Sequence, residues 1–351
     1  HHARVEPGNI YLIPPKVTLT ISGGRLQLEK TDPRRGLHLP IDQFFISLAL
    51  DQQHRAVAIV LSGTGSDGTA GIRAVKASGG MVMVQSEDSA QFDGMPRSAI
   101  ATGLADFVLA PDKMPAQLAS YLNHPLLTHV RGLGRRRGPE VDRALAEIFA
   151  SIRSQCGVDF THYKAATVDR RIERRMSVCQ IENLPDYARH LAQSPREIGV
   201  LFNEMLIGVT SFFRDRPAWE ALEKDVLPGL LKAVPDNETV RAWIAGCCTG
   251  EEAYSLAMLV AEQMDKAKMH NPVKIFATDI SRDSLATATR GHYSPAEVAT
   301  LSETRRNQFF VKESAGYRVK SRLREMVVFA NHNLLSDPPF TKLSLICCRN
   351  L

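Results

Sequence analysis

The sequence lacks an apolar run of the roughly 20 residues that a membrane-spanning helix requires. Its longest apolar runs, 56–61 and 343–348, are far shorter. It also lacks an initiator Met, and no basic segment leads into an apolar stretch with a small-residue cleavage site. We therefore expect no export signal and a cytoplasmic protein.

The cysteines are too scattered for the common zinc and dithiol motifs, because none belongs to a Cys-x-x-Cys pair. The six are Cys156, Cys179, Cys247, Cys248, Cys347 and Cys348. We expect small buried thiols in a reduced protein and no bound metal. The 43 Lys and Arg residues against 38 Asp and Glu residues give a net charge of only +5. That charge does not by itself indicate nucleic-acid binding.

The composition is that of a globular protein, with 44% hydrophobic and 23% charged residues in a chain long enough for two or three domains. In the first expected domain, 1–122, strand and helix patterns alternate. The expected strands are Ile10–Pro14 and Val17–Ile21, paired around Pro15, then Ala56–Ser62, Met81–Gln85 and Phe107–Leu109, with helices that include Leu39–Leu50 and Met95–Thr102. This order predicts a three-layer α/β sandwich with a parallel sheet.

His, Pro, Gly and Arg residues gather at 123–138 and indicate a linker. The next segment, 139–208, shows only helical periodicity and predicts a small all-helical domain. From 209 to 351 the alternation of strand and helix returns. The expected strands are Val240–Ala245, Lys274–Thr278, Met326–Ala330 and Ser344–Cys348, with helices Glu251–Gln263 and Asp283–Arg290 between them.

A glycine-bearing turn, 246–250, follows the first of these strands and opens a helix. Such a turn lets the backbone approach a ligand and aims free N–H groups at it. The next strand ends near Asp279, whose carboxylate can accept the two ribose hydroxyls of a nucleoside, or can act as the N-cap of the following helix. The turn lacks both the Gly-x-Gly-x-x-Gly and the P-loop spacing. A nucleoside without phosphates fits better, and S-adenosylmethionine is such a cofactor.

Five motifs occur in the order seen in CheR-type chemotaxis receptor methyltransferases, which the chain resembles from about Leu145 to its last residue. They are Val209-Thr210-Ser211-Phe212-Phe213-Arg214-Asp215, Gly250-Glu251-Glu252-Ala253-Tyr254-Ser255, Ala277-Thr278-Asp279-Ile280, Asn333-Leu334-Leu335 and Cys348-Arg349-Asn350. The resemblance implies a Rossmann-like domain that binds S-adenosyl-L-methionine and releases S-adenosyl-L-homocysteine.

The resemblance also implies a role for individual residues in binding the cofactor. Thr210 and Arg214 would contact the methionine end, Glu251 the amino group and Asp279 the ribose. The adenine would be framed by Asn333, Leu334, Asn350 and Leu351. Gly208 stands where many members of that family carry an Asn that helps to bind the cofactor.

Enzymes of this type transfer the methyl group from the sulfonium to a receptor glutamate. Displacement by a carboxylate needs orientation and a dry site more than a metal or an acid–base group. The resemblance therefore implies a protein-glutamate O-methyltransferase. Its partner would be a methyl-accepting, receptor-type signalling protein, with no nucleic acid and no membrane insertion.

Four arginines follow one another at helical spacing in the segment expected to be all-helical. Arg170, Arg171, Arg174 and Arg175 lie at i, i+1, i+4 and i+5, which places them on one face. A charge run of this kind is usually a solvated face. In the family the equivalent domain lies against acidic methylation helices of the receptor, so the resemblance implies that these arginines dock the substrate.

Two other classes of function stay open beside the methyltransferase. Asp337-Pro338-Pro339-Phe340 is similar to the Asp-Pro-Pro-Tyr/Phe motif of enzymes that methylate exocyclic amines of DNA, but it precedes the last expected strand and favours a turn. The sequence stops as that strand ends, before the further strands and the Tyr that the family carries. A regulator that docks on receptors without chemistry is therefore the third possibility.

The first 122 residues resemble CheB-type receptor methylesterases, which hydrolyse the same glutamyl esters. The motifs are Leu61-Ser62-Gly63-Thr64-Gly65-Ser66-Asp67-Gly68-Thr69 and Phe92-Asp93-Gly94-Met95-Pro96-Arg97-Ser98-Ala99. The resemblance makes Asp67 the Asp of a Ser-His-Asp triad, and its alternative role is to cap a helix. The Ser and His partners would lie upstream of Val5, so we expect this half to be inactive as an esterase. The whole is expected to be a methylesterase and methyltransferase fusion.

Overall fold

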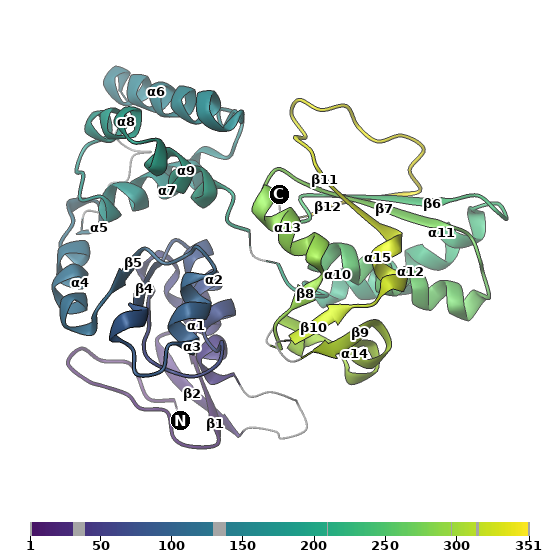
Figure 1. Ribbon diagram of the computed structural model, residues 1–351, viewed down its shortest axis with the longest axis horizontal. Coiled ribbons are helices and arrows are strands. Elements are labelled where there is room, and N and C mark those ends of the chain that lie inside the picture. Colours follow the sequence, from purple (N-terminus) through teal and green to yellow (C-terminus); the bar gives the residue numbers. More distant parts are fainter. Residues whose placement is uncertain are drawn as a thin grey trace. The chain divides into compact units, whose positions relative to one another are not determined.

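The computed structural model describes residues 2–30, 39–128, 138–208, 210–295, 297–313 and 316–349. The chain forms two compact units (Figure 1). The first comprises His1–Asp32 and Leu39–Ile207, and the second consists mainly of Gly208–Leu351. Among the described residues, no helix is both long enough and apolar enough to cross a bilayer.

The first unit begins with a β-hairpin. β1 (Val17–Ser22) and β2 (Arg25–Lys30) pair antiparallel across two glycines with positive φ. The strand predicted at Ile10–Pro14 was wrong, since the structure places no strand there. The side chains of Ile10 and Leu12 are 91% and 85% exposed. These side chains have no core to pack against. The hydrogen-bonding partner of β1 is β2, so β1 does not pair with 10–14 as predicted.

A three-stranded parallel sheet, in the order β3-β4-β5, forms the centre of this unit. The strands are β3 (Val57–Val60), β4 (Met81–Gln85) and β5 (Phe107–Leu109). The helices are α1 (Pro40–Gln52), α2 (Thr69–Ala77), α3 (Gly94–Ile100), α4 (Met114–Leu122) and α5 (Pro125–Thr128).

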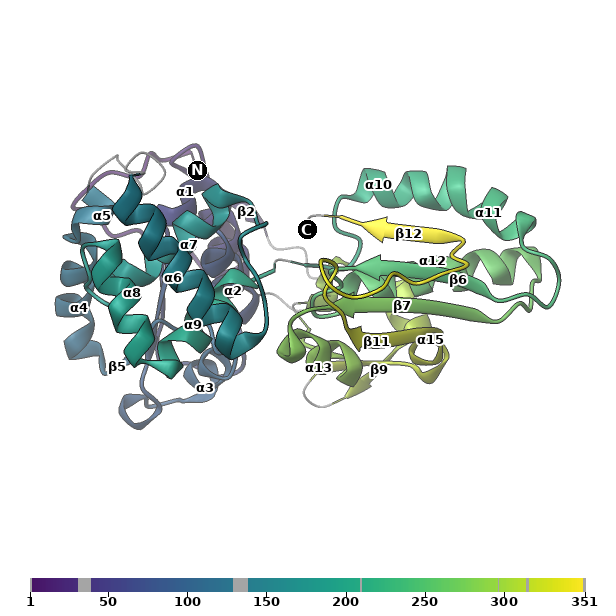
Figure 2. The ribbon, with the colours of Figure 1, turned by 90° about the horizontal axis from the view of Figure 1, so that it is seen from above.

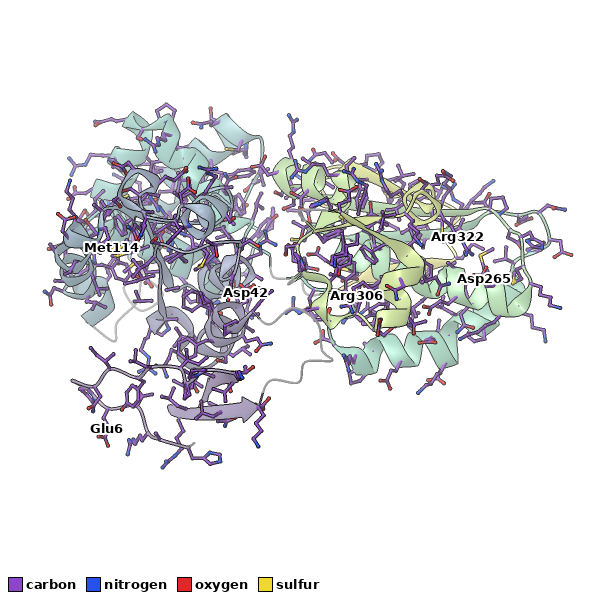
Figure 3. The ribbon with its side chains drawn as sticks, turned by 60° about the horizontal axis from the view of Figure 1, so that its bottom comes forward. Glu6, Asp42, Met114, Asp265, Arg306 and Arg322 are labelled. Carbon is purple, nitrogen blue, oxygen red and sulfur yellow. The ribbon has the colours of Figure 1, made fainter. Side chains whose placement is uncertain are left out.

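The two faces of the sheet are covered by different helices, as the side chains of β4 show. Val82 and Val84 pack in a core with residues of α1, α2 and α3. Met81 and Met83 pack in a second core with Met114 of α4, which Figure 3 labels. Because alternate residues of a strand point to opposite faces, the sheet lies between two helical layers. The predicted three-layer α/β sandwich is confirmed.

Four helices complete the first unit, as the helical periodicity predicted. They are α6 (Pro139–Cys156), α7 (Ala165–Val178), α8 (Leu184–Gln193) and α9 (Pro195–Met205). Local sequence sets their ends. Asn183 and Ser194 accept backbone N–H groups as N-caps of α8 and α9, and α6 ends before Gly157, which has a φ of +73°.

The second unit is built on a four-stranded parallel sheet in the order β11-β7-β6-β12 (Figure 2). The strands are β6 (Val240–Ala245), β7 (Val273–Asp279), β11 (Val327–Asn331) and β12 (Leu345–Cys348). The chain passes outward from β6 to β7 and β11, and then returns to the other side of β6. This reversal between β6 and β12 is a topological switch point, where ligands bind outside the carboxyl ends of the strands.

The remaining elements cover or extend this sheet. They are α10 (Arg216–Ala221), a π-helical turn (Leu222–Val226), α11 (Leu227–Ala233), α12 (Glu251–Ala267), α13 (Arg282–Arg290), α14 (Glu303–Phe309) and α15 (Ser321–Met326). A small antiparallel sheet, β8-β10-β9, is formed by β8 (His292–Tyr293), β9 (Phe310–Glu313) and β10 (Gly316–Val319). The Rossmann-like alternation predicted for this part of the chain is confirmed, and the small sheet was not predicted.

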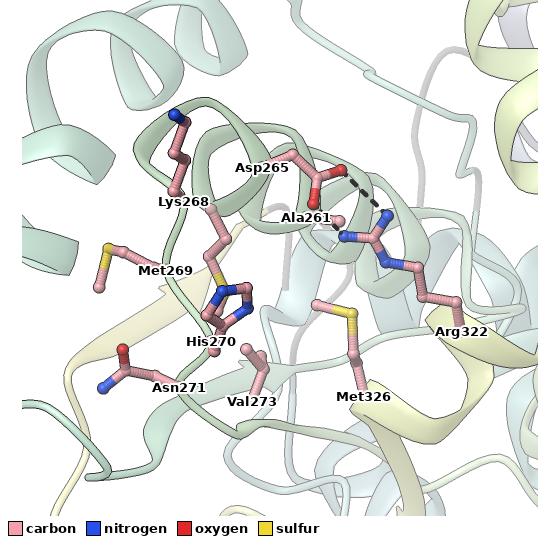
Figure 4. Close-up of a pocket in the computed structure, with 10 residues that line it drawn as sticks. Ala261, Asp265, Lys268, Met269, His270, Asn271, Val273, Arg322 and Met326 are labelled. Atoms are coloured by element: carbon pink, nitrogen blue, oxygen red, sulfur yellow. Dashed lines mark hydrogen bonds and ion pairs between the residues drawn. The ribbon is translucent and has the colours of Figure 1, made fainter.

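A pocket of about 610 Å³ lies at the C-terminal end of α12 (Figure 4). Arg322 closes its rim by donating to both carboxylate oxygens of Asp265, at 3.0 and 2.6 Å. Ala261, the first residue of α12 in the pocket lining, is ten residues after Glu251 at the start of the helix, a length of about 15 Å at 1.5 Å per residue. The pocket therefore lies away from the glycine-bearing turn.

Candidate functional site

The turn after β6 has a backbone that only glycine adopts without strain at two positions. Gly246 and Gly250 have φ values of +71° and +95°. A Cβ on Gly250 would come within 2.8 Å of the Cβ of Ala288 and 3.0 Å of the hydroxyl of Tyr293. That hydroxyl donates to the carbonyl of Thr249 at 2.8 Å. The turn is therefore held closely by α13 and β8, and α12 begins directly after it.

Asp279 ends β7 beside this turn. One of its carboxylate oxygens accepts the backbone N–H of Cys248 at 2.8 Å, and the other accepts the N–H of Ser281 at 2.8 Å. The N-cap of α13 is Ser281, whose hydroxyl accepts the N–H of Ser284. The alternative role of Asp279 as an N-cap was therefore wrong. A carboxylate has about four acceptor positions, so two remain for hydroxyl donors.

Two consecutive glutamates open α12 and have different surroundings. Glu251 is 1% exposed and accepts the hydroxyl of Thr249 at 2.7 Å. Glu252 has a buried carboxylate oxygen, Oε1, with no hydrogen-bond partner among the described residues. Burial raises the pKa of Glu252, an effect that the charges of Arg349 and Arg214 oppose. A buried acceptor without a donor is costly and points to a ligand group in that position.

The segment 211–215 is fixed against the same edge of the sheet. Arg349, which follows β12, donates to the carbonyl of Arg214 at 3.1 Å and to the carboxylate of Asp215 at 2.9 Å. Phe213 donates its N–H to the hydroxyl of Ser255 at 3.1 Å. Thr210 and Arg214 are both half-buried. The segment is thereby joined to both β12 and α12.

The chain after β11 brings Asn333 and Leu334 to this edge. His332 donates its N–H to the carbonyl of Asp279 at 3.1 Å. Asn333 accepts the N–H of Leu335 at 3.0 Å, and the side chain of Leu334 is 42% exposed. An exposed apolar side chain beside polar groups can serve as one wall for a planar base. Asn350 and Leu351, to which the sequence assigned the same task, lie outside the described residues, as does Val209.

The Asp-Pro-Pro-Phe motif has a structural role in the described residues. Asp337 accepts the N–H of Asn333 at 2.8 Å and so closes the turn after β11. The ring of Phe340 stacks on Phe276 with centroids 4.7 Å apart, and lies 5.2 Å from Trp243. The Phe340 ring is thus packed on side chains of β6 and β7. This packing agrees with the turn that the prolines predicted.

Asp67 in the first unit accepts three backbone N–H groups. They belong to Ile41 at 3.1 Å, Asp42 at 2.9 Å and Gly68 at 2.9 Å. Ile41 and Asp42 lie in the first turn of α1, so Asp67 caps α1 rather than the helix that follows it. This capping holds the carboxylate in one orientation beside the glycine-bearing loop 63–68.

The arginines of α7 do not form the open docking face that the sequence predicted. Arg171, Arg174 and Arg175 are only 7%, 4% and 6% exposed, and Arg170 alone of the four is exposed. The three buried side chains bind groups of this same unit, from the α2–β4 turn to α9. Spacing alone could not distinguish a solvated face from a buried one. The docking prediction is therefore wrong for these three arginines.

A possible group of metal ligands lies beside them. The ligand atoms of Cys179, His190 and Glu197 are within 4.8 Å of one another. Glu197 accepts two hydrogen bonds from Arg175 at 2.8 Å and one from the hydroxyl of Tyr187 at 2.9 Å. The guanidinium already supplies the positive charge that a cation would bring, so this group carries no metal-site assignment.

Sequence reasoning missed Glu252. Its neighbours from Ala253 to Ala261 are all buried, so helical periodicity could not show which of the two glutamates has an oxygen without a hydrogen-bond partner among the described residues. The only signal in the sequence is the pair itself, since two adjacent helical residues point in directions about 100° apart.

Comparisons with known proteins agree on three segments of the chain. A family model for the CheB methylesterase matches residues 1–118. A model for the all-alpha domain of the CheR methyltransferase matches 143–206, and a model for its SAM-binding domain matches 208–351. One solved structure, the Thermotoga maritima CheB methylesterase catalytic domain, is 31% identical with a TM-score of 0.31 over 33% of this chain and 64% of that one.

Two relatives are similar over much of the chain. An uncharacterized 104.1 kDa protein in the hypE 3' region of Rhodobacter capsulatus is 42% identical over 360 residues, which cover 97% of this chain but 38% of that protein. A chemotaxis protein methyltransferase of Listeria monocytogenes is 31% identical over 213 residues, which cover 61% of this chain and 79% of that protein. The chain therefore spans less than half the length of the Rhodobacter relative.

Proposed function

The chain belongs to the chemotaxis protein methyltransferase family, and we propose from this premise that it methylates glutamate carboxylates of a receptor-type signalling protein. It is a fusion of a CheB methylesterase domain with the all-alpha and SAM-binding domains of a CheR methyltransferase. Its second unit carries the proposed reaction. The observation that supports this most is the buried, unpartnered carboxylate oxygen of Glu252 at the switch point of the sheet.

The residues at this edge fit S-adenosylmethionine. Asp279 has free acceptor positions for the two ribose hydroxyls. Glu252 can accept the amino group of the methionine end, whose positive charge would offset the cost of the buried carboxylate. Acidic residues beside the turn disfavour the phosphates of a nucleotide and favour a cationic nucleoside. Leu334 provides apolar surface for the adenine.

This assignment replaces Glu251 by Glu252 as the acceptor of the amino group. Glu251 is buried and binds Thr249, so its task in the proposal is to hold the turn. Thr210 and Arg214 remain the proposed contacts to the methionine end. Arg349 and Ser255 hold the segment 211–215, which contains Arg214, beside α12. Asn333, Asn350 and Leu351 remain proposed neighbours of the adenine.

The chemistry asks little of the protein beyond orientation. When bound, S-adenosylmethionine supplies an electrophilic methyl group on a sulfonium. The residues of the chain bind it, exclude water and align an incoming glutamate carboxylate, which needs no proton transfer before it attacks. The acceptor is therefore a carboxylate side chain of a partner protein, and we place the reaction in the cytoplasm.

The experiment that tests the proposal is calorimetric titration of S-adenosylhomocysteine into the chain and into Asp279→Ala. We expect saturable binding that falls at least tenfold in the variant, because an Ala cannot accept the ribose hydroxyls. Asp265→Ala, which removes an exposed carboxylate at the far end of α12, is the control and should bind normally. Equal binding by Asp279→Ala would refute the ribose assignment.

The kind of product separates the methyltransferase from the alternatives. A glutamyl methyl ester releases methanol on mild treatment with base, whereas a methylated amine of a nucleic acid does not. With S-adenosylmethionine that carries a labelled methyl group, we expect a receptor-type protein to take up label that mild base releases. Label that resists base would favour a nucleic-acid enzyme. A folded chain that does not bind S-adenosylhomocysteine would favour a regulator that only docks.

For the first unit we propose that Asp67 is the acid of the methylesterase triad. Its three backbone hydrogen bonds support this role, because they hold the carboxylate where a further donor, such as an imidazole N–H, can approach it. In a chain that carries the upstream Ser and His of the triad, Asp67→Asn is expected to lower ester hydrolysis strongly while leaving methyl transfer intact. Unchanged hydrolysis would refute the role.

A further inference from the structure

We propose that three arginines of α7 form the centre of an arginine clamp, which holds the methylesterase domain and the all-alpha domain together as one body. The arginine clamp is the set Lys76, Asp106, Arg171, Arg174, Arg175, Glu197 and Glu204, in which the first two residues come from the methylesterase domain and the others from the all-alpha domain. This interface goes beyond the proposed methyl transfer and does not depend on it.

The first part of the clamp caps the end of α2. Arg171 donates to the carbonyls of Lys76 at 2.8 Å and Ala77 at 3.0 Å. Arg174 donates through Nε to the carbonyl of Gly80 at 3.0 Å. These carbonyls lie at or just after the C-terminus of α2, where helix carbonyls lack partners and the helix dipole favours a cation. Two guanidinium groups of one domain thus complete a helix of the other.

The turn between α2 and β4 is shaped for this contact. Gly79 has a φ of +87°, and a Cβ on Gly80 would lie 2.6 Å from the carbonyl oxygen of Ala56 and 2.7 Å from Val75. Only glycine at position 80 lets the turn pack this tightly. The tight turn leaves the carbonyl of Gly80 available to Arg174.

The second part of the clamp is a buried ion network. The Arg174 guanidinium bridges Asp106 of one domain and Glu204 of the other. Lys76 pairs with the same two carboxylates, its Nζ lying 2.9 Å from Glu204. The side chains of Asp106, Arg174 and Glu204 are at most 3% exposed. Both domains thus contribute charges to one site that excludes water.

The clamp contains four cations and three anions. Lys76, Arg174 and Arg175 face the carboxylates of Asp106, Glu204 and Glu197, while the fourth cation, Arg171, donates to the carbonyls of Lys76 and Ala77. Each partner supplies compensation for a charge that would otherwise be buried alone, a state that is strongly unfavourable. Separation of the two domains would therefore have to rehydrate the whole network at once.

Apolar contact accompanies the ion network. Val178, at the end of α7, packs against the methylesterase core formed by Met81, Met83, Met114 and Tyr121. Outside that core, Ser120 of α4 donates to the side chain of Gln180 at 2.8 Å. The face of the sheet that α4 leaves open is thus covered by the all-alpha domain. A partner of this surface needs an arginine-bearing helix with an apolar end, and α7 is that helix.

The clamp also explains what the row of arginines does. Arg171, Arg174 and Arg175 use their donors on groups of this chain, so an acidic segment of another protein can reach them only after the clamp opens. The all-alpha domain therefore stays with the methylesterase domain, although the family models assign it to the methyltransferase.

The test uses the full chain with a specific protease site placed within 129–137. After cleavage at about 0.15 M salt, where buried pairs are little screened, the two pieces of the otherwise native protein should elute together in size-exclusion chromatography. Asp106→Asn keeps an acceptor for the N–H of Val82 but leaves Arg174 and Lys76 undercompensated. We expect its pieces to associate roughly 100- to 1,000-fold more weakly and to separate.

Matched variants make the result decisive. Asp93→Asn breaks an exposed ion pair of the same domain and should leave the pieces together. Arg171→Met removes only the cap on the α2 carbonyls and is therefore a milder way to open the clamp. Circular dichroism before cleavage shows whether Asp106→Asn is folded. If it is not, Arg171→Met takes its place. Separation of the unsubstituted pieces would overturn the proposal. Retention by both Asp106→Asn and Arg171→Met would overturn it equally.

Discussion

Glu251 and Glu252 are consecutive residues, yet their carboxylates have different surroundings. Glu251 accepts the hydroxyl of Thr249, whereas Oε1 of Glu252 is buried without a hydrogen-bond partner among the described residues. A single helical step thus separates a carboxylate that is bound within the turn from a buried carboxylate oxygen that has no donor among the described residues. This difference is the basis for assigning the amino group of the cofactor to Glu252.

Glu252→Gln should weaken the binding of S-adenosylhomocysteine by about 10- to 100-fold, since a hydrogen bond to a charged group contributes roughly 1.5–3 kcal/mol. The free protein should be as stable as before or more so, because a buried charge with a raised pKa is removed. Calorimetric titration and urea unfolding measure the two effects.

Glu251→Gln is the matched control for that variant. It should lower the free energy of unfolding more than it lowers affinity, because its carboxylate binds Thr249 within the protein. If Glu251→Gln loses binding while Glu252→Gln keeps it, the assignment made from the sequence is right and the one made from the structure is wrong.

Arg349→Met should loosen the segment 211–215 and weaken the binding of S-adenosylhomocysteine by about tenfold. The variant loses two hydrogen bonds to this segment. Each contributes about 1 kcal/mol or less, because the position is partly exposed. The Met side chain retains contact with the ring of Trp219, beside which the guanidinium lies. Isothermal calorimetry measures the loss.

Arg322→Met serves as the control for this effect. It breaks the exposed pair with Asp265 at the far pocket, where Figures 3 and 4 label both residues. Its affinity for S-adenosylhomocysteine should not change. Equal loss in the two variants would show that the effect of Arg349 is not local to the site.

Gly250→Ala should destabilise the second unit by about 2–4 kcal/mol, the sum of a strained positive φ and overpacking against Ala288 and Tyr293. Gly229→Ala is the matched control, since its Cβ would meet nothing within 4 Å in α11. That variant should be stabilised by about 0.5–1 kcal/mol. The urea midpoints of unfolding of Gly250→Ala and Gly229→Ala measure the two effects. Similar midpoints for the two variants would contradict the packing described for the turn.

The parallel strands were predicted well because strands covered on both faces read as continuous apolar runs. The range Val240–Ala245 agrees residue for residue with β6. The small sheet was missed because its strands, of 2 to 4 residues, contain charged residues such as Lys312 and Arg318 and show no clear alternation. The domain boundaries at 122, 138 and 208 stay predictions.

The candidate site was predictable where a residue's position follows from topology. The turn after β6 and Asp279 at the end of β7 meet because the carboxyl ends of parallel strands share one edge. The surroundings of Glu252 and of the α7 arginines were not predictable, since they depend on tertiary partners. Asp106, which neutralises Arg174, is 68 residues away in the sequence. A charged residue at helical spacing does not reveal whether such a partner exists.

Asp42 should make the first unit less stable as the pH rises. Burial raises its pKa from 3.8 to about 6, and the charge of Asp67 also raises it. Hydrogen bonds from the N–H groups of Gly71, Ala70 and Gly68 lower the pKa and so oppose both effects. Between pH 3.8 and about 6 the unfolded chain loses the proton first, while the folded protein retains it. Stability therefore falls through this window, by up to about 3 kcal/mol for such a shift.

Asp42→Asn should remove that fall, because an Asn does not titrate and can still accept the N–H of Gly71. From pH 4 to pH 7, the free energy of unfolding of Asp42→Asn should rise relative to that of the unsubstituted chain by about 2 kcal/mol. Asp93→Asn, at an exposed pair, controls for the loss of an acidic residue. Urea unfolding across this range decides the matter, since a difference that does not change with pH would mean that Asp42 is already charged at pH 4.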